Sequence, residues 1–278
     1  MPEIGKTQIL PIVKEVNFGL YLDGGPYGEI LLPHGEILPG TINQTEAKVF
    51  LHFDSEDRLI ATTRKPFVEI NEFALLRVKS VNQIGAFMDW GLSKDLLVPF
   101  REQKIKLEKG RSYIVFVYGD VESQRFAASA KLSKFFSPHY PDLQIADAVD
   151  LIIWQQTDLG FKVIINHLYQ GMLFYNSIFQ ELNIGQKIKG FVKDVREDGK
   201  IDVTLSAPGY TKVQDILADI VDYLKQNRGA SELNDRTPPE TIYQLFGVSK
   251  KTFKSALGNL YKQGIISIDT SGIKLIKN

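Results

Sequence analysis

A glycine-interrupted β pattern occurs three times in the first 207 residues, and it limits the possible folds more than any other feature. Each copy has an extended stretch interrupted by a glycine, a short apolar strand, a second β stretch, a polar turn and a last strand that ends in small residues. The interrupting glycines are Gly19, Gly85 and Gly160. A chain with this repeat is expected to form several small, similar units rather than one large core.

Each copy is predicted to form a five-stranded barrel of the OB type. A glycine inside a strand marks a bulge or a sharp bend where a small barrel turns a corner, and five short strands in about 65–70 residues suit a Greek-key barrel. The sequence Glu197-Asp198-Gly199-Lys200 is a hairpin signal before the last strand of the third copy. The β stretches are residues 16–22, 29–33, 47–54 and 58–62, then 81–88, 95–99, 113–118 and 125–129, then 157–163, 170–174, 185–192 and 200–206.

The periodicity becomes helical after residue 208. Apolar residues from Val213 to Leu224 predict one amphipathic helix, and Thr237-Pro238-Pro239-Glu240 has the form of a capping box that starts a second. Ser249 is expected to cap a third helix, whose apolar face holds Phe253, Leu257, Leu260 and Tyr261, and residues 265–276 form a hairpin. This order of elements predicts a winged-helix domain.

The expected fold is therefore mainly β plus α, with three tandem OB-type barrels and a C-terminal winged helix-turn-helix. The domains are residues 1–66, 67–137, 138–207 and 208–278. Net charge is zero over the whole chain, but the second and fourth domains each carry three more basic than acidic residues and the other two carry three fewer. The second and fourth domains are thus the better candidates for contact with a polyanion.

The repeat resembles the ribosomal S1-type RNA-binding domain. The second and third copies match its pattern best, from Gly185 to Ser206 in the third, and the first is the most divergent. Three such repeats followed by a winged helix resemble the bacterial conserved virulence factor B proteins. That resemblance implies an RNA-binding regulator that influences mRNA levels or stability, and virulence traits where the organism is a pathogen.

In S1-type domains, nucleic-acid contacts gather on the bent strand, the end of the next strand and the turn before the last. Ile84 and Leu159 replace an expected aromatic residue, and Pro33 and Pro99 stand where a histidine is frequent. Each copy alone should therefore bind weakly, with affinity arising from several modules on one strand. The resemblance implies RNA contacts at Phe18, Tyr21 and Arg58 in the first copy, Phe87, Asp120 and Arg125 in the second, and Lys162, Phe174 and Lys200 in the third. For Phe18 and Phe87, a place in the barrel interior is an equal alternative.

Further RNA contacts are expected outside this pattern. Trp90 lies in an expected loop tip near Lys94, where an exposed indole would stack on a base, although packing against a neighbouring domain is an equal alternative. The third helix of the winged-helix domain presents several lysines, which favour phosphate contact over base readout. A solvated lysine face or a protein contact is the alternative there. These basic residues are Lys250, Lys251, Lys254 and Lys262 on the helix and Lys274 on the wing.

Catalytic and metal-binding motifs are missing from the sequence. It contains no cysteine, and its four histidines are dispersed without metal-ligand spacing. No phosphate-binding loop of the Gly-x-x-x-x-Gly-Lys-Ser/Thr type and no nucleophile elbow occur. We therefore expect no enzyme activity, no cofactor and no metal.

No apolar run reaches the roughly 18 residues of a membrane helix, and no secretory signal is visible at the start. The absence of cysteine fits a reducing compartment. We expect a cytoplasmic protein that binds single-stranded RNA and regulates gene expression. The alternatives are a DNA-binding transcription regulator that uses the winged helix, and a protein-binding scaffold that uses Trp90 and Trp154.

Overall fold

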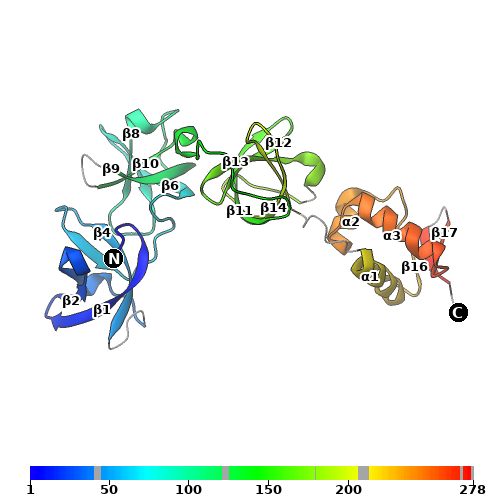
Figure 1. The fold of residues 1–278 in the computed structure, drawn as a ribbon, viewed down its shortest axis with the longest axis horizontal. Helices are drawn as coiled ribbons and strands as arrows, with labels where there is room; N and C mark the ends of the chain where they lie inside the picture. Colours follow the sequence, from blue (N-terminus) through cyan, green and yellow to red (C-terminus); the bar gives the residue numbers. More distant parts are fainter. Residues whose placement is uncertain (41–44, 121–124, 179, 206–212, 270–271, 277–278) are drawn as a thin grey trace. The chain divides into compact units, whose positions relative to one another are not determined.

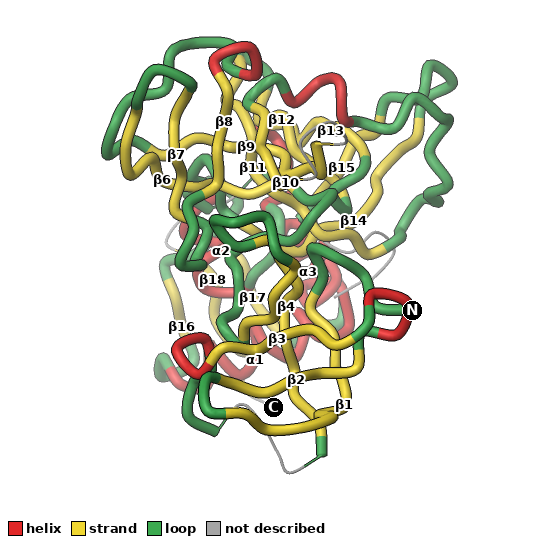
Figure 2. The backbone as a smooth tube through the Cα atoms, turned by 90° about the vertical axis from the view of Figure 1, so that its left-hand side faces the viewer, coloured by secondary structure: helices red, strands yellow, loops and turns green. Residues whose placement is uncertain are grey.

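Three closed five-stranded barrels precede a domain of three helices and a small sheet (Figure 1). The computed structural model describes residues 1–40, 45–120, 125–178, 180–205, 213–269 and 272–276. Among these residues, helix in the barrels is limited to short turns, and the α-helices belong to the C-terminal domain (Figure 2). The predicted fold class is confirmed.

The three barrels share one strand order, in which the first strand pairs with the second and fourth and the third pairs with the fifth. Every pairing is antiparallel except that of the third strand with the fifth, as in OB barrels. The strands are β1 (Thr7–Val16), β2 (Gly19–Asp23), β3 (Glu29–Pro33), β4 (Glu46–Phe53) and β5 (Leu59–Thr62), then β6 (Phe73–Val81), β7 (Gly85–Asp89), β8 (Leu96–Pro99), β9 (Ser112–Asp120) and β10 (Arg125–Ser129), then β11 (Ala148–Thr157), β12 (Gly160–Ile165), β13 (Tyr169–Phe174), β14 (Lys187–Val195) and β15 (Ile201–Thr204).

The repeated glycines start strands rather than bending them from within, which corrects the sequence-based expectation. Gly19, Gly85 and Gly160 are the first residues of β2, β7 and β12, and a short turn separates each from the strand before it. A Cβ at these positions would lie 2.2–2.3 Å from the carbonyl oxygen of Leu32, Val98 or Leu173 on the next strand. Glycine is therefore required because the two backbones come too close for any side chain.

A bulge lies in the first strand of each barrel. The register shifts at Val13, Lys79 and Trp154. In the first barrel, Thr7 to Pro11 pair with β4, whereas Ile12 and the residues after the bulge pair with β2. The extra residue bends and twists the strand, so one strand serves two neighbours and closes the barrel.

The C-terminal domain consists of α1 (Val213–Gln226), β16 (Ala230–Ser231), α2 (Pro239–Phe246), α3 (Lys250–Lys262), β17 (Ile266–Asp269) and β18 (Gly272–Leu275). Its core includes Ile220, Phe253 and Leu260, each at most 1% exposed. Ser249 caps α3 by accepting a hydrogen bond from the backbone N–H of Thr252 at 3.2 Å, as expected. The sequence did not indicate β16, which has only two residues and pairs with β18.

Two local expectations in this domain are wrong. Thr237 does not cap α2, because Pro238 occupies the N-cap and no side chain bonds there; the Thr237 hydroxyl instead accepts from the backbone N–H of Asn234 at 2.9 Å. Tyr261 is not on the apolar face of α3, since 58% of the residue is exposed. Leu260 already fills the core at this end of the helix.

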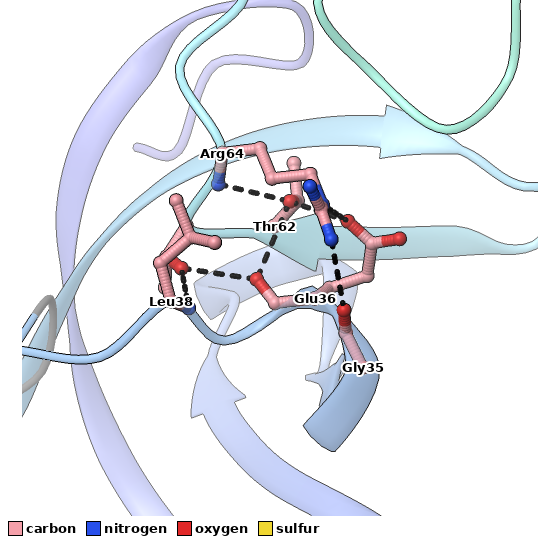
Figure 3. Close-up of polar contacts among 6 residues, drawn as sticks. Gly35, Glu36, Leu38, Thr62 and Arg64 are labelled. Carbon is pink, nitrogen blue, oxygen red and sulfur yellow. Dashed lines mark hydrogen bonds and ion pairs between the residues drawn. The ribbon is translucent and has the colours of Figure 1, made fainter.

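A polar network ties the segment after β3 to the end of β5 in the first barrel (Figure 3). The hydroxyl of Thr62 donates to the carboxylate of Glu36 at 2.7 Å, and Nε of Arg64 lies 3.3 Å from the same carboxylate. Arg64 also donates from Nη2 to the carbonyl of Gly35 at 3.4 Å. These contacts fix the chain where it leaves the first barrel for the second.

Candidate nucleic-acid interface

A groove of about 520 Å³ lies on the second barrel and is lined mainly by apolar atoms. Its walls come from β7, β8, the end of β9 and the start of β10, strands that the repeat places side by side. Besides Trp90, four aromatic residues line it: Phe87, Tyr118, Phe126 and, from the first barrel, Phe53. All four are half-buried, so part of each ring remains accessible to a ligand.

Three basic side chains border this groove: Lys94, Arg101 and Arg125. The two arginines are exposed, and Lys94 is half-buried. Flat rings beside cations form the arrangement in which bases stack while phosphates are neutralised. Of the residues expected from the sequence, Phe87, Trp90, Lys94 and Arg125 meet here.

Several groove residues were not singled out from the sequence. Arg101 follows the strand end that bears Pro99, and among the described residues it forms no ion pair. Tyr118 and Phe126 lie on the paired strands β9 and β10, opposite Ala127 and Gly119 respectively. Phe53 belongs to another barrel, and no local pattern places it here. The side chain of Asp120, implied by the family resemblance, lies outside the described residues.

Trp90 is not an exposed stacking platform, which corrects the expectation for this residue. It is 3% exposed, and its Nε1–H donates to the carbonyl of Lys94 at 2.6 Å. Its ring packs edge-on against Phe50 of the first barrel and Phe126 of the second. Trp90 therefore packs against a neighbouring domain, which is the alternative given above. This position is favourable because burial removes the large apolar surface of the indole from water.

Residues of the first barrel accept hydrogen bonds from both Lys94 and Arg125 of the second barrel. Nζ of Lys94 donates to the backbone carbonyl of Asp54 at 2.7 Å, and Nε of Arg125 donates to the carboxylate of Asp57 at 2.6 Å, with a second bond from Nη2. The hydrogen bond with Arg125 lowers the pKa of Asp57, and the same bond raises the pKa of Arg125. Two of the three cations of the groove, Lys94 and Arg125, therefore already have partners in the free chain.

The expected residues of the first barrel lie apart from this groove. Phe18 is 58% exposed and meets Tyr21 edge-on at 6.3 Å between ring centroids. Nζ of Lys14 lies 4.8 Å from the Tyr21 ring. Arg58 is exposed but pairs with Asp54 at 2.7 Å in its own turn. This barrel thus offers a small aromatic surface of its own.

One exposed position recurs in all three barrels. Phe18, Ile84 and Leu159 precede the repeated glycines, and 58%, 58% and 65% of these residues are exposed. Their carbonyls accept a hydrogen bond from the first residue after the third strand, which is His34, Phe100 or Tyr175. The replacement of an aromatic by Ile84 and Leu159 keeps an apolar surface at this position but removes the flat ring that stacks on bases.

The third barrel brings two of its three expected residues onto one strand pair. Lys162 and Phe174 lie on β12 and β13, both half-buried, and Nζ of Lys162 lies 5.7 Å from the Trp154 ring. Lys200 is separate, in the β14–β15 turn, where it pairs with Asp198 at 2.5 Å. Gly199 has the left-handed conformation that the hairpin signal requires, with φ of 77°.

The winged-helix lysines differ in their partners. Lys254 lies 3.6 Å from Asp235 and Lys274 lies 3.2 Å from Asp269. Lys251 and Lys262 are exposed and form no ion pair with any described residue. Lys250 is half-buried at the start of α3. The exposed ring of Tyr261 neighbours Lys262, so α3 presents both charge and an aromatic surface.

Within the described part of the chain, no group of three or more histidine or acidic side chains could hold a metal ion. No helix among these residues is long and apolar enough to cross a membrane.

Comparison with known proteins adds family names to these domains. A model described as "S1 domain" matches residues 4–64 and 72–131, and one described as "CvfB-like winged helix domain" matches residues 218–275. The S1 match includes the first barrel, which the sequence pattern ranks as the most divergent. These matches support nucleic-acid binding.

Curated relatives span nearly the whole chain. It is 28% identical to "Uncharacterized protein YitL" of Bacillus subtilis (strain 168), over 94% of this chain and 89% of that protein. It is 25% identical to "Conserved virulence factor B" of Staphylococcus haemolyticus (strain JCSC1435), over 99% of this chain and 95% of that protein. Among solved structures, a multidomain protein with nucleic-acid-binding domains from Streptococcus pneumoniae TIGR4 is 25% identical over 98% of both chains, with a TM-score of 0.38. The chain is therefore a relative of the conserved virulence factor B proteins over nearly its full length, with S1 domains followed by a CvfB-like winged helix.

Proposed function

We propose that this chain is a cytoplasmic RNA-binding protein, not an enzyme, that holds single-stranded RNA through several weak modules and influences gene expression after transcription. The groove of the second barrel carries the proposal, because Phe87, Tyr118 and Phe126 line one apolar depression bordered by Arg101 and Arg125. Half-buried rings suit unstacked bases, whereas the bases of a duplex are already stacked.

The other modules supply additional contacts. The third barrel offers Lys162 beside Trp154, and α3 offers Lys251 and Lys262. Each surface is small, so binding to one strand by several modules is needed for useful affinity, since the second contact forms at a high effective concentration. This arrangement predicts affinity that rises with RNA length.

The test compares a single-stranded RNA with a duplex DNA of equal length at two salt concentrations. We expect the full chain to prefer the RNA, and Phe87→Ala to weaken RNA binding by about 5- to 150-fold, the value of one base stack. Tyr27→Ala is the matched control, because this ring is 46% exposed but lies outside the groove.

Preference for duplex DNA would favour the alternative, a winged-helix transcription regulator, and the lysine variants of α3 would then lose most of the affinity. Equal RNA binding by Phe87→Ala and wild type would exclude the groove as the site.

A further inference from the structure

The β4–β5 turn of the first barrel reaches the groove of the second. Through this turn, the Asp57 carboxylate receives two hydrogen bonds from the Arg125 guanidinium, and the Asp54 carbonyl receives one from Lys94. Asp57 and Arg125 lie 68 residues apart in sequence. An acidic group thus pairs with one of the three cations of a groove that is otherwise suited to a polyanion.

The turn holds Asp57 in a defined position. The Asp54 carboxylate accepts from the backbone N–H groups of Glu56 at 2.8 Å and Arg58 at 3.0 Å, and the N–H of Asp57 donates to the Asp54 carbonyl at 3.2 Å. Asp57 itself has a left-handed backbone, with φ of 62°, a conformation that aspartate and asparagine tolerate better than most residues.

The two barrels are also held together beside this ion pair. Phe53 packs on Phe126, with ring centroids 6.1 Å apart, and Phe126 directly follows Arg125. The carboxylate is therefore kept near the guanidinium by packing as well as by charge. The side chains of Arg125 and Asp57 are nevertheless 50% and 44% exposed, so an anion from solution can reach them.

A carboxylate that accepts two parallel N–H bonds from a guanidinium has the geometry that a phosphate adopts on arginine. We propose that Asp57 takes the place of an RNA phosphate on Arg125 in the free chain and thereby sets the affinity of the groove. The proposal rests on the proposed function. RNA must displace Asp57 before its phosphate can bind Arg125, so the first barrel lowers affinity at this point.

The test uses Asp57→Asn in the full chain. Asparagine keeps the shape and tolerates the left-handed backbone but removes the charge. The matched control is Glu56→Gln, which removes one negative charge from the same turn, where Glu56 pairs with Arg58 at 3.0 Å. Binding of a single-stranded RNA to each variant is measured by fluorescence anisotropy, and thermal unfolding confirms that both variants fold.

We expect Asp57→Asn to tighten RNA binding by about two- to fivefold, the range of an exposed ion pair, and Glu56→Gln to change it less. In an Arg125→Ala background, the gain from Asp57→Asn should vanish, because the competing cation is gone. Equal gains for the two charge variants, or a gain that persists without Arg125, would overturn the proposal and leave RNA binding itself intact.

Failure of the proposed function has a different signature. If neither the wild type nor Asp57→Asn binds single-stranded RNA, both the function and this inference are wrong. If only Asp57→Asn binds it, the result supports the inference in its strongest form.

Discussion

The ring of Phe50 in β4 stands edge-on to the indole of Trp90 just after β7, with centroids 5.8 Å apart and ring planes at 86°. Phe50 is 1% exposed, and it belongs to the same buried cluster as Val78, Met88 and Val98 of the second barrel. A residue of the first barrel therefore completes the core of the second. This shared core explains why the two barrels present one groove, with Phe53 from one and Phe87 from the other.

Phe50→Ala should destabilise the second barrel as well as the first. Removing a buried phenylalanine costs about 3–5 kcal/mol, and the cavity would open beside Trp90. Hydrogen exchange should show lost protection in β6–β10. Phe18→Ala is the control, because that ring is exposed and its loss should leave exchange in both barrels unchanged. Lost protection confined to β1–β5 would contradict the shared core.

Gly85→Ala should destabilise the chain by about 2–4 kcal/mol, within the range of severe single substitutions. The new Cβ would lie 2.3 Å from the carbonyl oxygen of Val98, so β7 and β8 would have to separate. Gly35→Ala is the control, because a Cβ there meets nothing within 4 Å. Denaturant unfolding of the two variants checks the difference. Equal stability would show that the close backbone approach does not require glycine.

The presence of the repeated glycines is evident in the sequence, whereas their structural role is not. The glycines were visible because a backbone constraint repeats in every copy and leaves the same residue type each time. Their role was harder to assign, since a glycine that starts a strand and one that bends a strand look alike in sequence. Strand number, barrel type and the winged helix followed from local periodicity, which is set by side chains near in sequence.

The groove was less predictable because it depends on contacts between barrels. Phe50 lies in an apolar β stretch, but nothing in that stretch indicates that its ring fills the core of the neighbouring barrel. The sequence around Trp90 resembles a loop tip. Its packing partner Phe50 lies 40 residues earlier in the chain, so local sequence gives no sign that Trp90 is buried. Arg125 is named by the family resemblance, but its pairing with Asp57 depends on packing between barrels that no short motif encodes. The role of each of these residues in RNA binding stays a prediction.

Lys251→Gln should weaken RNA binding more than Lys274→Gln. Lys251 has no ion-pair partner among the described residues, whereas Lys274 lies 3.2 Å from Asp269 and would have to leave it to reach a phosphate. Loss of one phosphate contact should reduce the slope of log affinity against log salt by about 0.7. Titrations of each variant at several salt concentrations give this slope. A larger loss for Lys274→Gln would place the wing, rather than α3, on the RNA.

Stability of the first barrel should fall as pH drops below the usual histidine pKa of 6.5. His52 is 2% exposed, and its Nε2 has no hydrogen-bond partner among the residues that the structure describes. Burial lowers the pKa of His52, and Lys94 lowers it further, whereas Glu36 and Asp54 act in the opposite direction. The folded chain therefore binds fewer protons than the unfolded chain below pH 6.5.

The free energy of unfolding should consequently be highest above pH 6.5 and decline on acidification by at most about 1.4 kcal/mol per pH unit for this one group. Unfolding at pH 7.5 and about pH 5.5 measures the decline while Asp54 and Asp57, whose pKa values lie below 3.8, stay ionised. His52→Leu should flatten the dependence, and His34→Gln, at an exposed position, should retain it. An unchanged decline in His52→Leu would assign the pH dependence to another group, because leucine cannot take up the proton that burial makes costly.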